Sequence, residues 1–182
     1  AKVVVEEKYS ASKFWKWMVD HEVTKFNIVG TISYFMWNTP PVPEEKQHKV
    51  KLVLGSPAPH DIIEEFMKRF NIKFMEGYGL TEIGQCTWMR PGEVFRVGSC
   101  GKEAPGYEIK IGNPETDEEV PRGEIGEILV RPRTPNLMLH YYHKMPQKTV
   151  DDFRNFWFHT GDAGRMDKDG YIYFVDRVKD YL

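Results

Sequence analysis

The sequence predicts an α/β fold followed by a β-rich subdomain with a distorted, barrel-like sheet. In the first half of the chain, short apolar runs alternate with amphipathic segments, a pattern typical of parallel strands covered by helices. From about Gly84 onward, helical periodicity nearly vanishes, and turn signals separate short runs of alternating polarity. We therefore expect residues 1–85 to form an α/β portion and residues 86–176 to form an antiparallel, β-rich portion.

The α/β portion is predicted to contain three helices between short strands. Lys2 to Val5 is a β-branched, strand-like run, and a helical face of four apolar residues follows it, Phe14, Trp15, Met18 and Val19. The remaining predicted elements are strands at Phe26–Val29, Val50–Leu54 and Ile72–Met75, a short helix at Ile32–Trp37 before Pro40 and Pro41, and an amphipathic helix at Pro59–Phe70 capped by Asn71. Tyr34, Phe35 and Trp37 are interpreted as core residues in preference to a substrate cage.

The β-rich portion is predicted to contain strands at Tyr107–Ile111, Glu124–Arg131 and Tyr171–Val175. Gly112-Asn113-Pro114 and Asp167–Gly170 supply turn signals between them. One helix, at about Pro146–Asp152, interrupts the strands, because proline is well suited to the first turn of a helix.

The composition excludes some classes of function. The 182 residues carry 25 Lys and Arg against 27 Asp and Glu, a formal charge of −2, which argues against nucleic acid as a partner. The longest apolar stretch, Phe26 to Trp37, is interrupted by polar residues and too short for a transmembrane segment. Only Cys86 and Cys100 are present, without zinc-type spacing, so a reducing, cytoplasmic location is expected.

Three segments place glycine, hydrogen-bonding groups and charge together at expected loops: Glu76-Gly77-Tyr78-Gly79-Leu80-Thr81-Glu82, Thr160-Gly161-Asp162 and Asp176-Arg177-Val178-Lys179-Asp180. The first follows a predicted strand, where open α/β sheets bind ligands. Its glycines would allow close approach of a ligand, and its tyrosine, threonine and glutamate offer an aromatic face, a hydroxyl and a carboxylate. On these local features alone, a tight turn with a solvated glutamate is the favoured interpretation.

Taken together, the order and spacing of these segments resemble the adenylate-forming superfamily of AMP-dependent synthetases and ligases. That superfamily includes acyl-CoA synthetases, firefly luciferase and peptide-synthetase adenylation domains. Tyr78–Glu82 resembles its Tyr-Gly-x-Thr-Glu motif, Gly123–Ile128 its Gly-Glu-Ile/Leu segment, and Trp157–Asp162 its aromatic-x-x-Thr-Gly-Asp motif. The run Tyr173–Tyr181 is most similar to acyl-CoA synthetases, including the crotonobetaine/carnitine-CoA ligase group.

The resemblance implies a bound nucleotide and assigns residues to its base and ribose. Tyr78 would stack on adenine, and Gly55-Ser56-Pro57 resembles the family's Gly-Gly-Ala loop on the other side of the base. Asp162 would accept both ribose hydroxyls, and Arg177 would reach the ribose or phosphate region. The residues expected to bind ATP or AMP are Gly55, Ser56, Pro57, Glu76, Gly77, Tyr78, Asp162 and Arg177.

The resemblance also implies catalytic residues and a two-step reaction. Thr81 would hydrogen-bond the α-phosphate, and Glu82 would hold Mg²⁺ against the phosphates. Lys179 occupies the family's hinge position, so residues 177–182 would begin the hinge to a C-terminal domain. The carboxylate of a small acid would first attack the α-phosphorus of ATP, giving an acyl-adenylate and releasing pyrophosphate. The thiol of CoA would then displace AMP to give a thioester.

Two parts of the family's machinery have no counterpart in the 182 residues. The Ser/Thr/Gly-rich phosphate loop is not found, and the chain stops before the C-terminal domain that supplies the catalytic lysine. The chain is therefore expected to be part of the large N-terminal domain, with negligible adenylation activity by itself. His140 stands where relatives usually have glycine before a tyrosine. His140, His143 and His159 are expected to be surface or loop residues, since they lack metal-ligand spacing.

Other functions remain open at this point. Asp167, Asp169 and Gly170 match three positions of an EF-hand calcium loop, although Arg165 and Asp176 do not fit positions one and twelve, and a hairpin turn explains them better. A non-catalytic, β-rich interaction module is a second alternative. Another adenylate-forming enzyme, such as a peptide-synthetase adenylation domain or a luciferase-like enzyme, is a third. Loss of AMP binding on Asp162→Ala would favour the ligase over the module.

Overall fold

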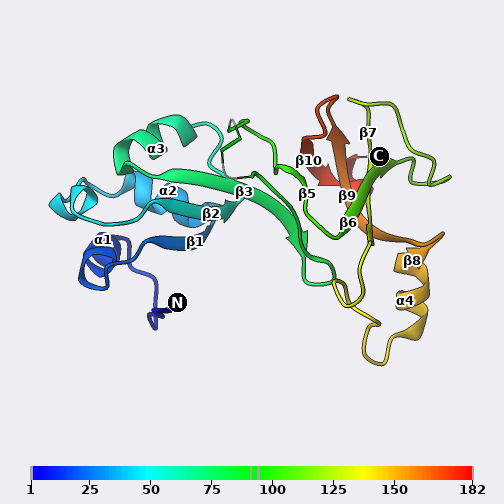
Figure 1. Ribbon diagram of the computed structural model, residues 1–182, viewed down its shortest axis with the longest axis horizontal. Helices are drawn as coiled ribbons and strands as arrows, with labels where there is room; N and C mark the ends of the chain where they lie inside the picture. The colour runs from blue at the N-terminus through cyan, green and yellow to red at the C-terminus, as the bar shows by residue number, and fades with distance from the viewer. Residues whose placement is uncertain (1, 91, 94, 182) are drawn as a thin grey trace. The chain divides into compact units, whose positions relative to one another are not determined.

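The computed structural model describes residues 2–90, 92–93 and 95–181. The chain divides into two compact units, residues 1–76 and residues 77–182. Strand β3 (Lys73–Leu80) runs from the first unit into the second (Figure 1). It pairs in parallel with β2 as far as Glu76 and antiparallel with β4 from Gly77 onward.

The first unit is an α/β structure. Its elements before β3 are α1 (Ala11–Asp20), β1 (Lys25–Val29), α2 (Gly30–Asn38), the 3-10 helix η1 (Pro43–Lys46), β2 (Leu52–Ser56) and α3 (Ile63–Phe70). Strands β1, β2 and β3 are parallel neighbours. The connections through α2 and α3 explain this, because parallel strands need a crossover between them. The predicted α/β architecture is confirmed.

The core of the first unit lies where the apolar faces of its helices meet the sheet. Its most deeply buried side chains include Met36, Val53, Ile63, Phe66 and Phe70. Helix α3 ends where Asn71 adopts the left-handed conformation, with φ of 51°, and so acts as the predicted C-terminal cap.

The second unit is built on antiparallel strands. After β3 it contains β4 (Gly84–Trp88), β5 (Lys102–Glu103), β6 (Tyr107–Gly112), β7 (Ile125–Pro132), α4 (Pro146–Asp152), β8 (Phe153–Arg154), β9 (Trp157–Met166), β10 (Ile172–Arg177) and α5 (Val178–Tyr181). One sheet has the order β10-β9-β7-β6, with β8 paired to β9. A buried cluster that includes Ile83, Cys86, Ile128, Val130 and Ile172 forms the core. Burial raises the pKa of Cys86 to about 12, so this thiol is a packing group.

Some expectations about local structure are wrong. Lys2–Val5 is not a strand, and Val3 and Val5 are exposed, so β-branching without a partner strand is insufficient. All three segments expected at loops lie wholly or partly in regular elements. Glu76–Leu80 lies in β3 and Thr160–Asp162 within β9, while Asp176 and Arg177 end β10 and the next three residues begin α5. Within the described ranges, no helix is long and apolar enough to cross a membrane.

Candidate functional site

Strand β9 carries a bulge opposite β7. On β7 only Ile128 separates Glu127 from Leu129, whereas on β9 Thr160, Gly161 and Asp162 separate their partners His159 and Ala163. Gly161 has φ of +70°, a conformation that glycine adopts far more readily than other residues. The strand therefore leaves the regular ladder at Thr160–Asp162, and bulges of this kind redirect side chains.

Three hydrogen bonds hold the bulge. The Thr160 hydroxyl donates to the carbonyl of Ile128 at 2.8 Å, and the same hydroxyl oxygen accepts the backbone N–H of Asp162 at 3.1 Å. The Gly161 N–H donates to Glu127 Oε1 at 2.9 Å. Bonds to both the carbonyl and the side chain of β7 thus fix the position from which Asp162 extends.

Asp162 is the centre of a small polar cluster. Its side chain accepts the Tyr78 hydroxyl on Oδ2 at 2.5 Å and pairs through Oδ1 with the guanidinium of Arg177. Asp162 is only 2% exposed, and a buried carboxylate of this kind requires such partners. Burial raises the pKa of the Tyr78 hydroxyl well above its usual value, and the hydrogen bond to Asp162 raises it further. The same aspartate raises the pKa of Arg177.

The structure thus brings Tyr78, Asp162 and Arg177 together, although 84 positions separate the first two. Phe174 on β10 completes the cluster, with its ring centroid 6.3 Å from that of Tyr78 and the planes inclined by 26°. Phe174 was not selected from the sequence, because nothing in the local pattern distinguishes it from the adjacent strand aromatic Tyr173.

Thr81 and Glu82 lie in the turn between β3 and β4, where the N–H of Ile83 bonds to the carbonyl of Leu80 at 3.2 Å. Thr81 is exposed, and Glu82 is half-buried. The hydroxyl of Tyr142 lies 3.0 Å from Glu82 Oε1 and 2.9 Å from Asp152 Oδ2. Tyr142 therefore orients Glu82. The sequence does not indicate this role, because the two residues are 60 positions apart.

The Tyr142 hydroxyl lies within hydrogen-bonding distance of two carboxylates and has one proton to donate to either of them. Burial, followed by the hydrogen bonds to Asp152 and Glu82, raises its pKa. Lys148 Nζ bonds to Asp152 Oδ2 at 2.6 Å and balances part of the negative charge.

Glu82 is the candidate for the one protein carboxylate that a magnesium site would need. Among the described residues, no group of three or more His, Cys, Asp or Glu side chains could enclose a metal. Mg²⁺ is commonly bound by one or two carboxylates, with water and substrate phosphates completing its coordination. One accessible carboxylate in a turn is consistent with that type of site.

In the first unit, Gly55 and Ser56 end strand β2, and Pro57 follows. Gly55 pairs with Glu76 on β3. A Cβ on Gly55 would lie 2.7 Å from the ring of Phe74, so this position requires glycine. Glu76 accepts the N–H of Ala58 at 2.9 Å and pairs with His60 Nε2 at 2.9 Å.

A hollow of about 640 Å³ lies at the carboxyl ends of β1 and β2, lined by residues of the first unit that include Val29, Thr31, Tyr34, Ser56, His60 and Asp61. The Tyr34 hydroxyl donates to Asp61 Oδ1 at 2.5 Å. The expectation that Tyr34 and Phe35 belong to the core is wrong, because they are 39% and 54% exposed. Carboxyl ends of parallel strands are the usual ligand-binding edge of such sheets.

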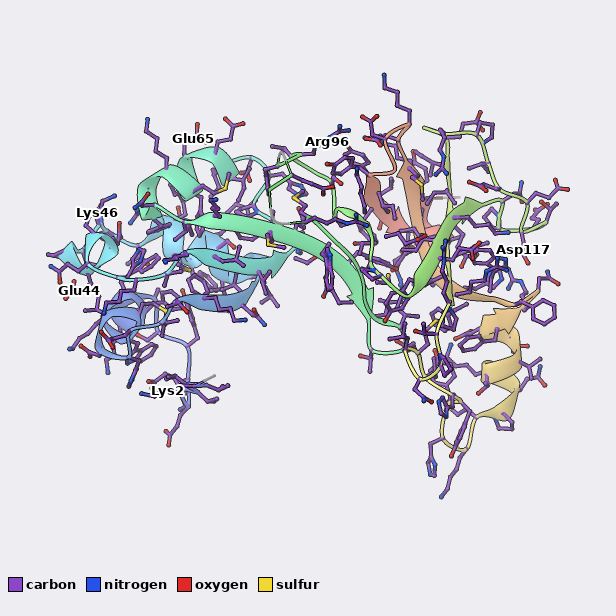
Figure 2. The ribbon with its side chains drawn as sticks, viewed as in Figure 1. Lys2, Glu44, Lys46, Glu65, Arg96 and Asp117 are labelled. Atoms are coloured by element: carbon purple, nitrogen blue, oxygen red, sulfur yellow. The ribbon has the colours of Figure 1, made fainter. Side chains whose placement is uncertain are left out.

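The histidine and calcium interpretations have separate outcomes. His159 is buried and its Nδ1 lies 2.9 Å from Glu127 Oε2, so the expectation of a surface or loop position is wrong for it. Asp167 accepts the N–H groups of Asp169 and Tyr171, and Arg96, labelled in Figure 2, pairs with both aspartates. These contacts form a hairpin turn between β9 and β10, as predicted in preference to a calcium-binding loop. Lys179 lies exposed on α5.

Comparison with known proteins identifies the family. The sequence profile described as AMP-binding enzyme matches residues 1–142, well over half of the chain. The chain belongs to the AMP-binding enzyme family. The resemblance drawn from the motifs is therefore confirmed.

Curated crotonobetaine/carnitine–CoA ligases are about one-third identical to this chain over nearly all of its length. It is 33% identical over 180 residues to a crotonobetaine/carnitine–CoA ligase of Proteus mirabilis, covering 97% of this chain and 35% of that protein. It is 32% identical over 177 residues to the protein of the same name from Salmonella typhimurium, covering 96% and 34%. The chain thus spans about a third of the length of these relatives.

Solved structures, among them two CoA ligases, have the same fold. A benzoate CoA ligase from Burkholderia xenovorans matches with a TM-score of 0.85 at 26% identity, covering 97% of this chain and 36% of that one. ATP-bound MatB from Rhodopseudomonas palustris matches with a TM-score of 0.84 at 29% identity, covering 96% and 34%. An anthranilate CoA ligase, AuaEII, in complex with anthranoyl-AMP matches with a TM-score of 0.83 at 26% identity, covering 94% and 33%.

Proposed function

We propose that the protein containing this chain is an ATP-dependent acid:CoA ligase that forms an acyl-adenylate and then transfers the acyl group to CoA. Support comes from the relatives, which are CoA ligases, and from similar proteins solved with ATP and with an acyl-AMP. The observation that carries the proposal within this chain is the buried Asp162 carboxylate, held between Tyr78 and Arg177.

Asp162 has the chemistry required to bind a ribose. An ionised carboxylate offers two oxygens with about four acceptor positions. The two protein partners use one position on each oxygen, which leaves acceptor capacity for two ribose hydroxyls. Tyr78 is proposed to contact the adenine and Arg177 the ribose or the phosphate. Gly55, Ser56, Pro57, Glu76 and Gly77 retain their proposed role as nucleotide-binding backbone.

Thr81 and Glu82 are proposed to act on the phosphates. The exposed Thr81 hydroxyl is free to donate to an α-phosphate oxygen, where negative charge accumulates in the transition state. Glu82, oriented by Tyr142, would supply one ligand to Mg²⁺, which when bound neutralises phosphate charge. Lys179 is proposed as the hinge to the C-terminal domain.

The proposed acids are crotonobetaine and carnitine, the substrates in the names of the most similar curated relatives considered above. Both acids carry a quaternary ammonium group. The hollow of the first unit presents the Tyr34 ring and the Asp61 carboxylate, and an aromatic face with a nearby anion suits such a cation. A screen of acids with the whole protein, measuring AMP release, would test this. Activation of benzoate in preference to carnitine and crotonobetaine would contradict it.

The proposed location is the cytoplasm, with ATP, CoA and a small carboxylic acid as the partners. Cys86 and Cys100 are both buried thiols, which is consistent with a reducing compartment. The charge of −2 offers no basic excess for nucleic acid.

Titration of the 182-residue chain with AMP, followed by calorimetry, tests the nucleotide site. We expect Asp162→Ala to weaken AMP binding at least tenfold, since a hydrogen bond to a charged group contributes about 1.5–3 kcal/mol. Asp169→Ala is the matched control, because it removes another aspartate paired with arginine, at the β9–β10 turn. Equal AMP affinity in wild type and Asp162→Ala, or no binding by the folded wild type, would favour a non-catalytic module.

A further inference from the structure

Behind the bulge of β9 lies a buried carboxylate, Glu127 of β7. Its side chain is 6% exposed, and both of its oxygens are used. Oε1 accepts the N–H of Gly161 at 2.9 Å, and Oε2 lies 2.9 Å from Nδ1 of His159. This second bond forms when the imidazole carries its proton on Nδ1 and donates it to Oε2. Glu127 thus joins the residues before and within the bulge.

Gly161 faces open space where a side chain would lie. A Cβ at this position would meet no atom within 4 Å, so packing around a side chain does not define its conformation. Its left-handed backbone is instead defined by hydrogen bonds, through Thr160 on one side and Glu127 on the other. Loss of the Glu127 bond would leave the Gly161 N–H without that acceptor, and the bulge would be held by Thr160.

His159 keeps Glu127 in its position from the opposite side. The imidazole is 5% exposed and lies between two carboxylates, with Nε2 3.6 Å from Asp117 Oδ2. Asp117, labelled in Figure 2, accepts the side chain of Asn155 at 2.6 Å and lies 3.7 Å from Arg154. Glu127 and Asp117, which flank the imidazole, therefore each have another hydrogen-bond partner. The Glu127 carboxylate consequently has little freedom to turn away from Gly161.

We propose that Glu127 is a positioning residue for nucleotide binding: by holding the N–H of Gly161, it fixes the bulge that directs Asp162 toward the ribose hydroxyls. The inference rests on the proposed function, because it assumes that Asp162 binds ribose. If the Glu127–His159 pair only stabilised the sheet, losing Glu127 would weaken the binding of every nucleotide equally. A positioning role instead predicts that the effect of losing Glu127 depends on the ribose hydroxyls.

The test compares Glu127→Ala, Glu127→Gln and the wild-type chain. Glutamine retains an acceptor for the Gly161 N–H and can donate to Nδ1 in the other histidine tautomer, so it should preserve the bulge. Glu103→Ala is the matched control, because Glu103 Oε2 also accepts a backbone N–H, that of Ile109, at 2.9 Å. Thermal unfolding of each variant establishes that it is folded at the temperature of the assay.

Two measurements are made on each protein: amide hydrogen exchange at Gly161, and affinity for AMP and for 2′,3′-dideoxy-AMP. We expect Glu127→Ala to increase exchange at Gly161 at least tenfold and to weaken AMP binding about tenfold, with less than a twofold change for the dideoxy nucleotide. Glu127→Gln and Glu103→Ala should resemble the wild type in both measurements.

Unchanged exchange at Gly161 in Glu127→Ala would overturn the inference. Equal losses for AMP and its dideoxy analogue would also overturn it, since they indicate a structural role alone. If the folded wild type binds AMP and its dideoxy analogue equally, Asp162 does not bind ribose and the proposed function fails at this site. Exchange at Gly161 then decides by itself whether Glu127 holds the bulge.

Discussion

The bulge of β9 and the turn between β3 and β4 belong to the same unit but differ in how firmly their functional groups are held. In the bulge, Asp162 is buried and bonds to Tyr78 and Arg177, while its backbone is fixed by Thr160 and Glu127. In the turn, Thr81 is exposed, and Glu82 is oriented through the single hydroxyl of Tyr142. The part proposed to bind ribose is therefore preorganised, and the part proposed to bind the phosphates is open.

The difference is consistent with the chemistry proposed for each region. A ribose is the same in every step of an adenylation reaction, so a rigid acceptor loses little by being fixed in advance. Phosphate groups change during the proposed reaction, and a turn that binds them would have to accept different geometries. Equivalent substitutions should therefore lower the free energy of unfolding much more in the bulge than in the turn.

The largest effect is expected from Asp162→Ala. This change removes the acceptor of the buried Tyr78 hydroxyl, and we expect the free energy of unfolding to fall by about 2–3 kcal/mol. Thr81→Ala, the corresponding change in the turn, should cost less than about 0.5 kcal/mol, as is typical of an exposed site. Urea unfolding measures both. Similar losses in the two variants would show that the regions do not differ in rigidity.

An intermediate effect is expected from the ionisation of Tyr78. Its pKa is raised in the folded protein, chiefly by burial, so the unfolded chain loses this proton first, near pH 10. The protonated Tyr78 hydroxyl therefore contributes stability below pH 10, and this contribution is lost progressively as the pH rises above 10. The stability difference between wild type and Tyr78→Phe should shift by about 1.4 kcal/mol against the wild type from pH 9 to pH 11. A constant difference would show that Tyr78 is not a buried phenol.

The smallest effect is expected from Tyr142→Phe. Removing this hydroxyl eliminates the hydrogen bond that orients Glu82, with an expected loss of about 0.5–1.5 kcal/mol by urea unfolding. Tyr141→Phe is the control, because Tyr141 is strongly exposed. Equal stability of the two variants would mean that Tyr142 does not restrain the turn, and the contrast with the bulge would become sharper still.

Much of the fold could be predicted from the sequence because its elements are determined locally. Helix α4 spans the predicted residues Pro146–Asp152, and the left-handed Asn71 ends α3 as expected. The run Lys2–Val5 shows the limit of that reasoning, since a strand also needs a partner. The exposed Tyr34 shows the same limit, because an apolar helix does not reveal which of its faces is covered.

The candidate site depended on contacts that local patterns do not contain. Asp162, Tyr78 and Arg177 were identified through a resemblance of motifs, whereas the bulge that positions Asp162 arises from an unequal number of residues on two paired strands. Glu127 and His159 are 32 positions apart, so no local sequence pattern connects them. Their contact follows from the pairing of β7 with β9, which only the structure shows.

The role of the Asp162 cluster is tested most directly by a map of backbone amide shifts in the 182-residue chain as AMP is added. The largest shifts should occur at Tyr78, Gly161, Asp162 and Arg177, and they should be lost in Asp162→Ala. Unchanged amides at these positions, with AMP-dependent shifts elsewhere in the chain, would contradict this role.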